Sequence, residues 1–130
     1  MSKVGRVDAG KFTLMASAAV TKNAQVKISG ASKCAMAGVG EAAIGVALTA
    51  ATATGIVIDI KPYNAAGTFN GVTASAVAAG AVLYTAAAGA VNDATTSGSG
   101  GIVGIAVTAG AATAGGDTIE FITPGPIATT

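Results

Sequence analysis

The most constraining feature of this chain is that it repeats itself. Three pairs of segments align in the same order: VTKNAQVKI with VAAGAVLYT, IGVALTA with VGIAVTA, and TGIVIDI with GGDTIEFI. Self-similarity of this kind indicates one structural unit formed twice. A fold for this chain must therefore accommodate two similar halves.

The alignment also predicts where each half turns. It places Asn23 opposite Gly80, and Asn and Gly are the residues that most readily accept a positive φ. We therefore expect a turn at both positions. The turn divides the long glycine-free run 11–29 into two strands.

Glycine spacing and apolar alternation predict the fold class. Nineteen glycines interrupt the chain at short intervals, which disfavours long helices despite the high helix propensity of alanine. Apolar and polar residues alternate in FTLM, AQVKIS, IVIDIK, AVLYT, IVGIAVT and DTIEFI. A period of two is typical of strands with one buried face. The sequence predicts an all-β fold, a compact barrel or sandwich of short strands built from two repeats, with little or no helix.

The repeats also suggest how the chain is organised around one shared core. The expected parts are an N-terminal arm at 1–11, a single β domain at 12–124 (repeat one at about 19–62, a connection at 63–75, repeat two at about 76–124) and a C-terminal tail at 125–130.

Composition disfavours several classes of function. A net charge of +1 argues against nucleic acid as a partner. Long uncharged stretches are rich in Gly, Thr, Ser and Ala rather than Leu, Ile and Phe, so we expect no membrane-spanning segment. No apolar run follows the charged N-terminus, so we expect no secretory signal. The chain contains no His, which is the usual general base and the commonest metal ligand. We expect no enzyme activity, no catalytic residue, no metal and no cofactor.

One motif raises the possibility of a nucleotide cofactor. Gly38, Gly40 and Ala43 have the G-x-G-x-x-A spacing of dinucleotide-binding loops. Asp59 follows about 20 residues later, where such proteins carry a ribose-binding carboxylate. That fingerprint must follow a buried strand and begin a helix, whereas KCAMA, before the glycines, is a poor buried strand. Asp59 aligns with Glu120, each an outward residue of an alternating strand. We interpret the motif as structural.

Two further positions are interpreted as structural. Gly45 and Gly104 share one place in the repeated strand, which predicts a bulge or a close backbone approach there. Cys34 is the only cysteine, so no intramolecular disulfide is possible. Neighbours on a strand face opposite ways, so Lys33 is not expected to activate the thiol, and Cys34 is expected to be a buried or semi-buried apolar residue.

Charge is distributed unevenly along the chain. Residues 1–33 hold six of the seven basic residues and one acid, whereas the remaining 97 residues hold one lysine and five acids. Such asymmetry is a feature of docking segments. An ordinary solvated mixture of charges is the alternative.

The basic segment MSKVGRVDAGKF has no counterpart in the duplication, so we expect it to act as a docking arm. In that hypothesis the valines cover apolar surface and the basic side chains lie near acidic patches of a partner. The expected contact residues are Lys3, Val4, Arg6, Val7 and Lys11. A frayed terminus is the alternative.

Four segments carry a family resemblance: ASAAVTKNAQVKI, GEAAIGVALTAATATGIVIDI, AVAAGAVLYTAAAGAV and GGIVGIAVTAGAATAGGDTIEFI. In their order and spacing over about 110 residues they resemble the capsid cement, or head decoration, proteins of tailed bacteriophages, a family formerly catalogued as a domain of unknown function. The stretch YNAAGTFNG and the tail PGPIATT depart from the family pattern.

The resemblance implies a small β-rich protein that assembles, often as trimers, on the outside of a phage head and stiffens it. The implied partners are the major capsid protein and further copies of the chain. The implied location is the virion capsid surface, after synthesis and assembly in the host cytoplasm. A repeat module of a phage fibre or surface adhesin is the alternative, and a small nucleotide-dependent enzyme is a third, disfavoured one.

Overall fold

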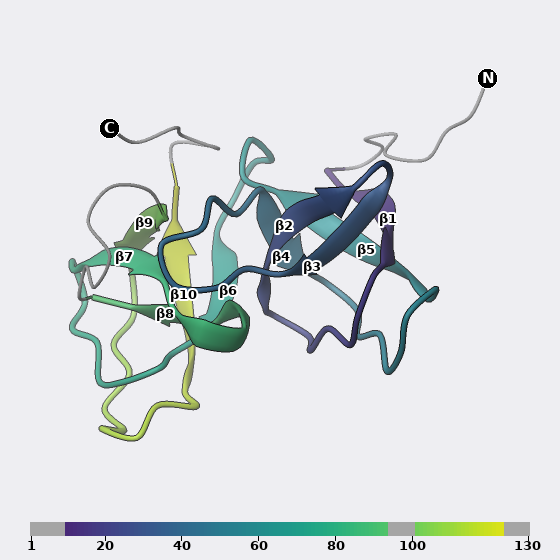
Figure 1. The fold of residues 1–130 in the computed structure, drawn as a ribbon. Coiled ribbons are helices and arrows are strands. Elements are labelled where there is room, and N and C mark those ends of the chain that lie inside the picture. Colours follow the sequence, from purple (N-terminus) through teal and green to yellow (C-terminus); the bar gives the residue numbers. More distant parts are fainter. Residues whose placement is uncertain (1–9, 94–100, 124–130) are drawn as a thin grey trace.

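The computed structural model describes residues 10–93 and 101–123, and it confirms the all-β prediction. Figure 1 shows two groups of strands side by side. We call β1–β5 the first unit and β6–β10 the second unit. The described residues form ten strands and one 3₁₀ turn: β1 Phe12–Ala16, β2 Gln25–Gly30, β3 Lys33–Met36, β4 Gly45–Ala47, β5 Val57–Pro62, β6 Phe69–Val72, β7 Val82–Thr85, η1 Ala87–Gly89, β8 Val91–Asn92, β9 Ile102–Ala106 and β10 Thr118–Ile122.

The two units have the same strand order. In the first unit the order β1-β3-β2-β4-β5 closes into a barrel, because β1 pairs in parallel with β3 and antiparallel with β5. In the second unit the order β8-β7-β9-β10-β6 repeats this arrangement. Its end strands meet at one parallel bridge, Thr73 to Val91. The predicted duplication is therefore visible in the topology.

The structural repeat is longer than the one expected from the sequence. Phe12 pairs with Ile60 in the first unit, and Phe69 pairs with Phe121 in the second, so β1 and β6 are counterparts. The stretch 63–75, expected to be a connection, contains β6. The sequence alignment did not detect this pair of strands, because FTLMA and FNGV share little beyond their phenylalanine.

The predicted turns at Asn23 and Gly80 are confirmed. Their φ values are 69° and 87°. The Asn23 N–H donates to the Ala47 carbonyl at 2.8 Å, and the Gly80 N–H donates to the Ala106 carbonyl at 2.7 Å. The two turns therefore make the same backbone hydrogen bond in the two units.

The close backbone approach expected at Gly45 and Gly104 is also present. A Cβ on Gly45 would overlap the carbonyl oxygen of Lys61, and a Cβ on Gly104 would overlap that of Ile122. Any side chain at either position would push β4 away from β5 or β9 away from β10.

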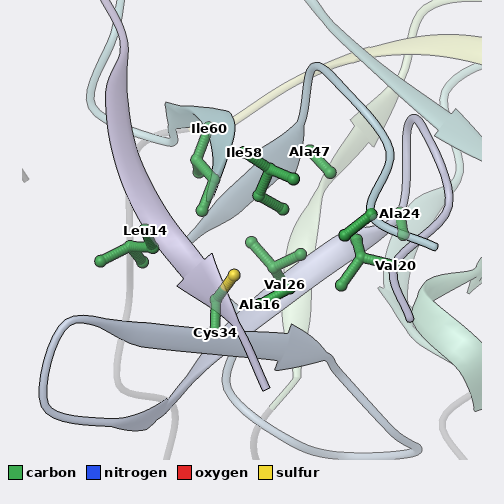
Figure 2. Packing of buried hydrophobic residues seen from close by; sticks show 10 residues of the cluster. Leu14, Ala16, Val20, Ala24, Val26, Cys34, Ala47, Ile58 and Ile60 are labelled. Atoms are coloured by element: carbon green, nitrogen blue, oxygen red, sulfur yellow. The ribbon is translucent and has the colours of Figure 1, made fainter. Parts of the chain in front are cut away.

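Buried apolar residues form two clusters rather than the one core expected from the duplication. The first lies in the first unit, and the second combines residues of the second unit with Tyr63 and with Val46 of β4. Figure 2 shows members of the first cluster, in which the side chains of Val26 and Ile58 point toward each other inside the barrel. The second contains three aromatic rings, with Tyr63 5.7 Å from Phe69 and 6.4 Å from Phe121 between centroids. The closed barrel of the first unit encloses the first cluster, whereas the second cluster lies against the five-stranded sheet of the second unit and extends to Val46 of β4.

Candidate interaction surface

The units meet along an outward row of three residues in the first unit. Gln25, Val46 and Lys61 lie directly opposite one another across β2, β4 and β5. The Gln25 side chain is fully buried, and its oxygen accepts a hydrogen bond from the Tyr63 hydroxyl at 2.5 Å. Its Nε2 donates to the Asn70 carbonyl at 3.4 Å. Burial raises the pKa of Tyr63 far above its usual range, so the hydroxyl stays protonated as the donor.

The other two residues of this row also contact the second unit or the segment that leads into it. Val46 packs in the apolar cluster of the second unit. The Lys61 ammonium lies 4.4 Å from the centroid of the Phe69 ring and donates to the Thr68 carbonyl at 2.6 Å. The row is therefore covered by the stretch from Tyr63 to Asn70.

Backbone contacts hold a second part of the junction. The Gly89 N–H donates to the Ala37 carbonyl at 2.9 Å, and the Thr85 hydroxyl donates to the Glu41 carbonyl at 3.0 Å. A Cβ on Gly89 would lie 2.7 Å from the Cβ of Ala24. The units are packed too closely here for a side chain at position 89.

The second unit carries an outward row in the same register, but this row is exposed. Val82, Ile105 and Ile122 lie directly opposite one another across β7, β9 and β10. Their exposed fractions are 42%, 44% and 49%. We call these three residues the exposed row. Large apolar side chains gathered on neighbouring strands are typical of an interaction surface.

The exposed row was not among the sequence-based predictions. The sequence did contain a signal for it. IVGIAVT and TIEFI have apolar residues on both faces of the strand, whereas a strand with one face in water has apolar residues mainly on its other face. Alternation alone points to the buried face and leaves the outward apolar residues unexplained.

Of the five predicted docking residues, the structure describes one. Lys11 precedes β1, and its ammonium lies 3.1 Å from an Asp59 carboxylate oxygen. Lys3, Val4, Arg6 and Val7 lie outside the described residues. Asp59 is therefore held by Lys11 on the barrel surface, and the docking role of the arm stays a prediction.

The glycine motif does not have the structure of a nucleotide loop. The strand β4 follows it rather than a helix. The Gly38 N–H donates to the Glu41 carboxylate at 2.6 Å, and Lys27 lies 2.8 Å from the same carboxylate. The hydrogen bonds from Lys27 and then from Gly38 lower the pKa of Glu41, so a negative charge is already fixed at the loop. The Gly38 N–H that a phosphate would need as a donor is therefore already occupied by a carboxylate.

The segment KCAMA, interpreted as a poor buried strand, does contain a strand, with one fully buried residue among its four. It is β3, and Cys34 within it is fully buried in the barrel while Lys33 is exposed. The expected buried cysteine is confirmed, and burial raises the pKa of its thiol.

Metal-ligand clusters and membrane-spanning helices are both lacking in residues 10–93 and 101–123. Within these ranges no three His, Cys, Asp or Glu side chains are placed together to hold a metal ion. Nor do the same ranges contain a helix of the length and apolar character needed to cross a membrane. The expected lack of enzyme activity stays a prediction.

Comparison with known proteins identifies the fold. No protein-family model and no curated protein matches the chain. Among solved structures, the chain is similar to the N base of head fibre gp8.5 in bacteriophage phi29, with a TM-score of 0.69 and 16% sequence identity. The match covers 90% of this chain and 96% of that one. The shared fold therefore includes both units and their junction.

Proposed function

We propose that this chain is a structural virion protein that decorates and stabilises the outer surface of a tailed-phage capsid. The observation that supports it most is the shared fold with the phi29 head fibre base, which extends over nearly the whole of both chains. The sequence resemblance to cement proteins supports the same location independently.

The physical properties of the molecule suit such a role. The first unit is a closed barrel around an apolar cluster, the second unit packs around a second cluster, and a buried hydrogen bond between Gln25 and Tyr63 stabilises the junction. Such a module can transmit force between capsid subunits without changing shape. Modest contacts per chain suffice when several copies are engaged together.

The partners in this proposal are the major capsid protein and further copies of the chain, with a trimer as the expected oligomer. The N-terminal arm is the proposed contact with the shell. Its basic residues would face acidic patches, and its valines would cover apolar surface.

The base of a head fibre is the second candidate function, and the comparison with phi29 favours it specifically. A cement protein occupies the lattice positions of the shell and strengthens it. A fibre base instead anchors a projecting structure. The two candidates therefore differ in their effect on shell stability.

Binding of the purified chain to expanded heads that lack it tests both candidates. For a cement protein we expect electron cryomicroscopy to show density at every equivalent lattice site, and heated heads to rupture at a higher temperature. Binding with an unchanged rupture temperature would favour the fibre base. If the chain does not bind heads, neither candidate is correct.

Deletion of residues 2–10 tests the arm. We expect the deletion to abolish head binding and to leave the melting temperature nearly unchanged. Exposed ion pairs contribute only about 0 to 1 kcal/mol each, so Lys3→Gln with Arg6→Gln should weaken binding and its salt dependence without abolishing it. Lys22→Gln, which removes an exposed charge in the turn of the first unit, is the matched control. Full occupancy by the deleted chain would assign docking to the barrel loops.

A further inference from the structure

The internal repeat shows how the exposed row can be covered. In the first unit, β4 places Val46 between Gln25 and Lys61. In the second unit, β9 places Ile105 between Val82 and Ile122. Each residue of one row is the repeat counterpart of a residue in the other: Gln25 of Val82, Val46 of Ile105, and Lys61 of Ile122.

The covering surface in the first case is formed by the stretch from Tyr63 to Asn70, which leads into β6, and by one end of the second unit. It contains Phe69, whose ring lies beneath Lys61, and Gly89, which lies against Ala24 and the Gln25 carbonyl. The junction within the chain thus shows how such a row is buried by the end of a neighbouring unit.

The first unit has an end of the same construction. Phe12 is the counterpart of Phe69, since Ile60 and Phe121 pair with them at the same register. Ser32 is the counterpart of Gly89, and both have a positive φ, of 59° and 73°. We call Phe12, Ser32 and Lys33 the head surface. Phe12 is only partly buried there and Lys33 is exposed.

We propose that the exposed row of one chain docks onto the head surface of a second copy, so that copies associate head to tail. The contact would repeat between chains the junction that joins the two units within a chain. The argument rests on the internal repeat and does not depend on the proposed role on a phage head.

The charge distribution favours contact of an exposed row with a head surface over contact between two exposed rows. Residues 10–62 contain five lysines and two acids, whereas residues 63–123 contain three acids and no basic residue. A head-to-tail contact brings the basic unit against the acidic one. Contacts between two exposed rows would bring like charges together, which opposes association.

Such a contact uses two different surfaces, so it is heterologous. After the first contact, one copy retains a free exposed row and the other a free head surface. Further copies can therefore add until a ring closes. A closed ring of three copies would satisfy the trimer proposed above without any contact of two-fold symmetry.

Sedimentation velocity of the full chain over a concentration series tests the proposal. The wild-type chain should associate as concentration rises. Ile105→Lys replaces a half-exposed side chain and should weaken association at least about tenfold, with an unchanged circular dichroism spectrum. Val39→Lys is the matched control, because Val39 is 46% exposed in the loop between β3 and β4, belongs to neither surface, and should behave as wild type.

A mixing experiment tests the head-to-tail geometry. Lys33→Glu alters the head surface, so alone it should also associate weakly. A mixture of Ile105→Lys and Lys33→Glu chains retains one intact row and one intact head, and should form one-to-one heterodimers that neither variant forms alone. A contact of two identical surfaces would show no such rescue.

Three results would overturn the proposal. One is a wild-type chain that stays monomeric up to the highest soluble concentration. Another is an Ile105→Lys chain that associates as strongly as wild type. The third is association that begins only after deletion of residues 125–130, because that would assign the C-terminal tail as the segment covering the row.

Discussion

Replacing Tyr63 by Phe should destabilise the protein through a single lost hydrogen bond. The Tyr63 hydroxyl donates to the Gln25 side-chain oxygen, and both residues are buried between the units. The substitution keeps the aromatic ring, and therefore its edge contacts with Phe69 and Phe121. It leaves the Gln25 oxygen buried with no donor among its described contacts. A buried polar group without a partner costs about 1–3 kcal/mol, and we expect that loss in the free energy of unfolding.

Equilibrium unfolding in urea, followed by circular dichroism, measures this loss. Tyr84→Phe is the control, because Tyr84 is the other tyrosine of the chain and is partly exposed on β7. It should change stability by no more than about 0.5 kcal/mol. The double variant Gln25→Met with Tyr63→Phe should cost less than the sum of the two single variants, because residues in contact are not additive. Equal stability of Tyr63→Phe and the wild type would refute the reasoning.

Three further predictions concern single positions. Gly45→Ala and Gly104→Ala should each destabilise the fold by about 1–3 kcal/mol in urea unfolding, because the added Cβ overlaps a carbonyl oxygen; Gly30→Ala, whose Cβ would meet nothing closer than 3.7 Å, is the neutral control. The Cys34 thiol, buried and with a raised pKa, should react with a thiol reagent at neutral pH only after denaturant is added; rapid reaction in the native state would contradict this. Glu41 has a lowered pKa, so its contribution to stability is present above the usual glutamate range and is lost as pH falls through the lowered value. Because Glu41 is exposed, Glu41→Gln should reduce stability at pH 7 by only a few tenths of a kcal/mol, and the two urea midpoints should converge in acid.

Self-comparison of the sequence predicted those parts of the fold that both repeats encode alike. Asn23 and Gly80 align in the sequence, and both adopt the same turn. Self-comparison failed where corresponding strands of the two repeats contain different residues. The strand β6 contains Gly71 at the position where β1 has Leu14, because the Phe121 ring and Val91 fill the space there.

The strand β3 was missed for a different reason. Alternation in KCAM is weak, since only Cys34 of its four residues is fully buried. Its pairing partners β1 and β2 define it as a strand, and such pairing over a distance is not visible in a local pattern. The exposed row was likewise invisible from local pattern alone. Its three residues lie far apart in the sequence, and only the register of β7, β9 and β10 brings them together.

Closure of the first unit also bears on how the protein avoids misassembly. Every strand from β1 to β5 has a hydrogen-bonded neighbour on both sides. Strands without such neighbours are templates for edge-to-edge aggregation and amyloid growth. A chain so rich in small apolar residues would be vulnerable to that process at high concentration. The barrel presents no such template between β1 and β5, so copies that meet through this unit must recognise one another by side chains.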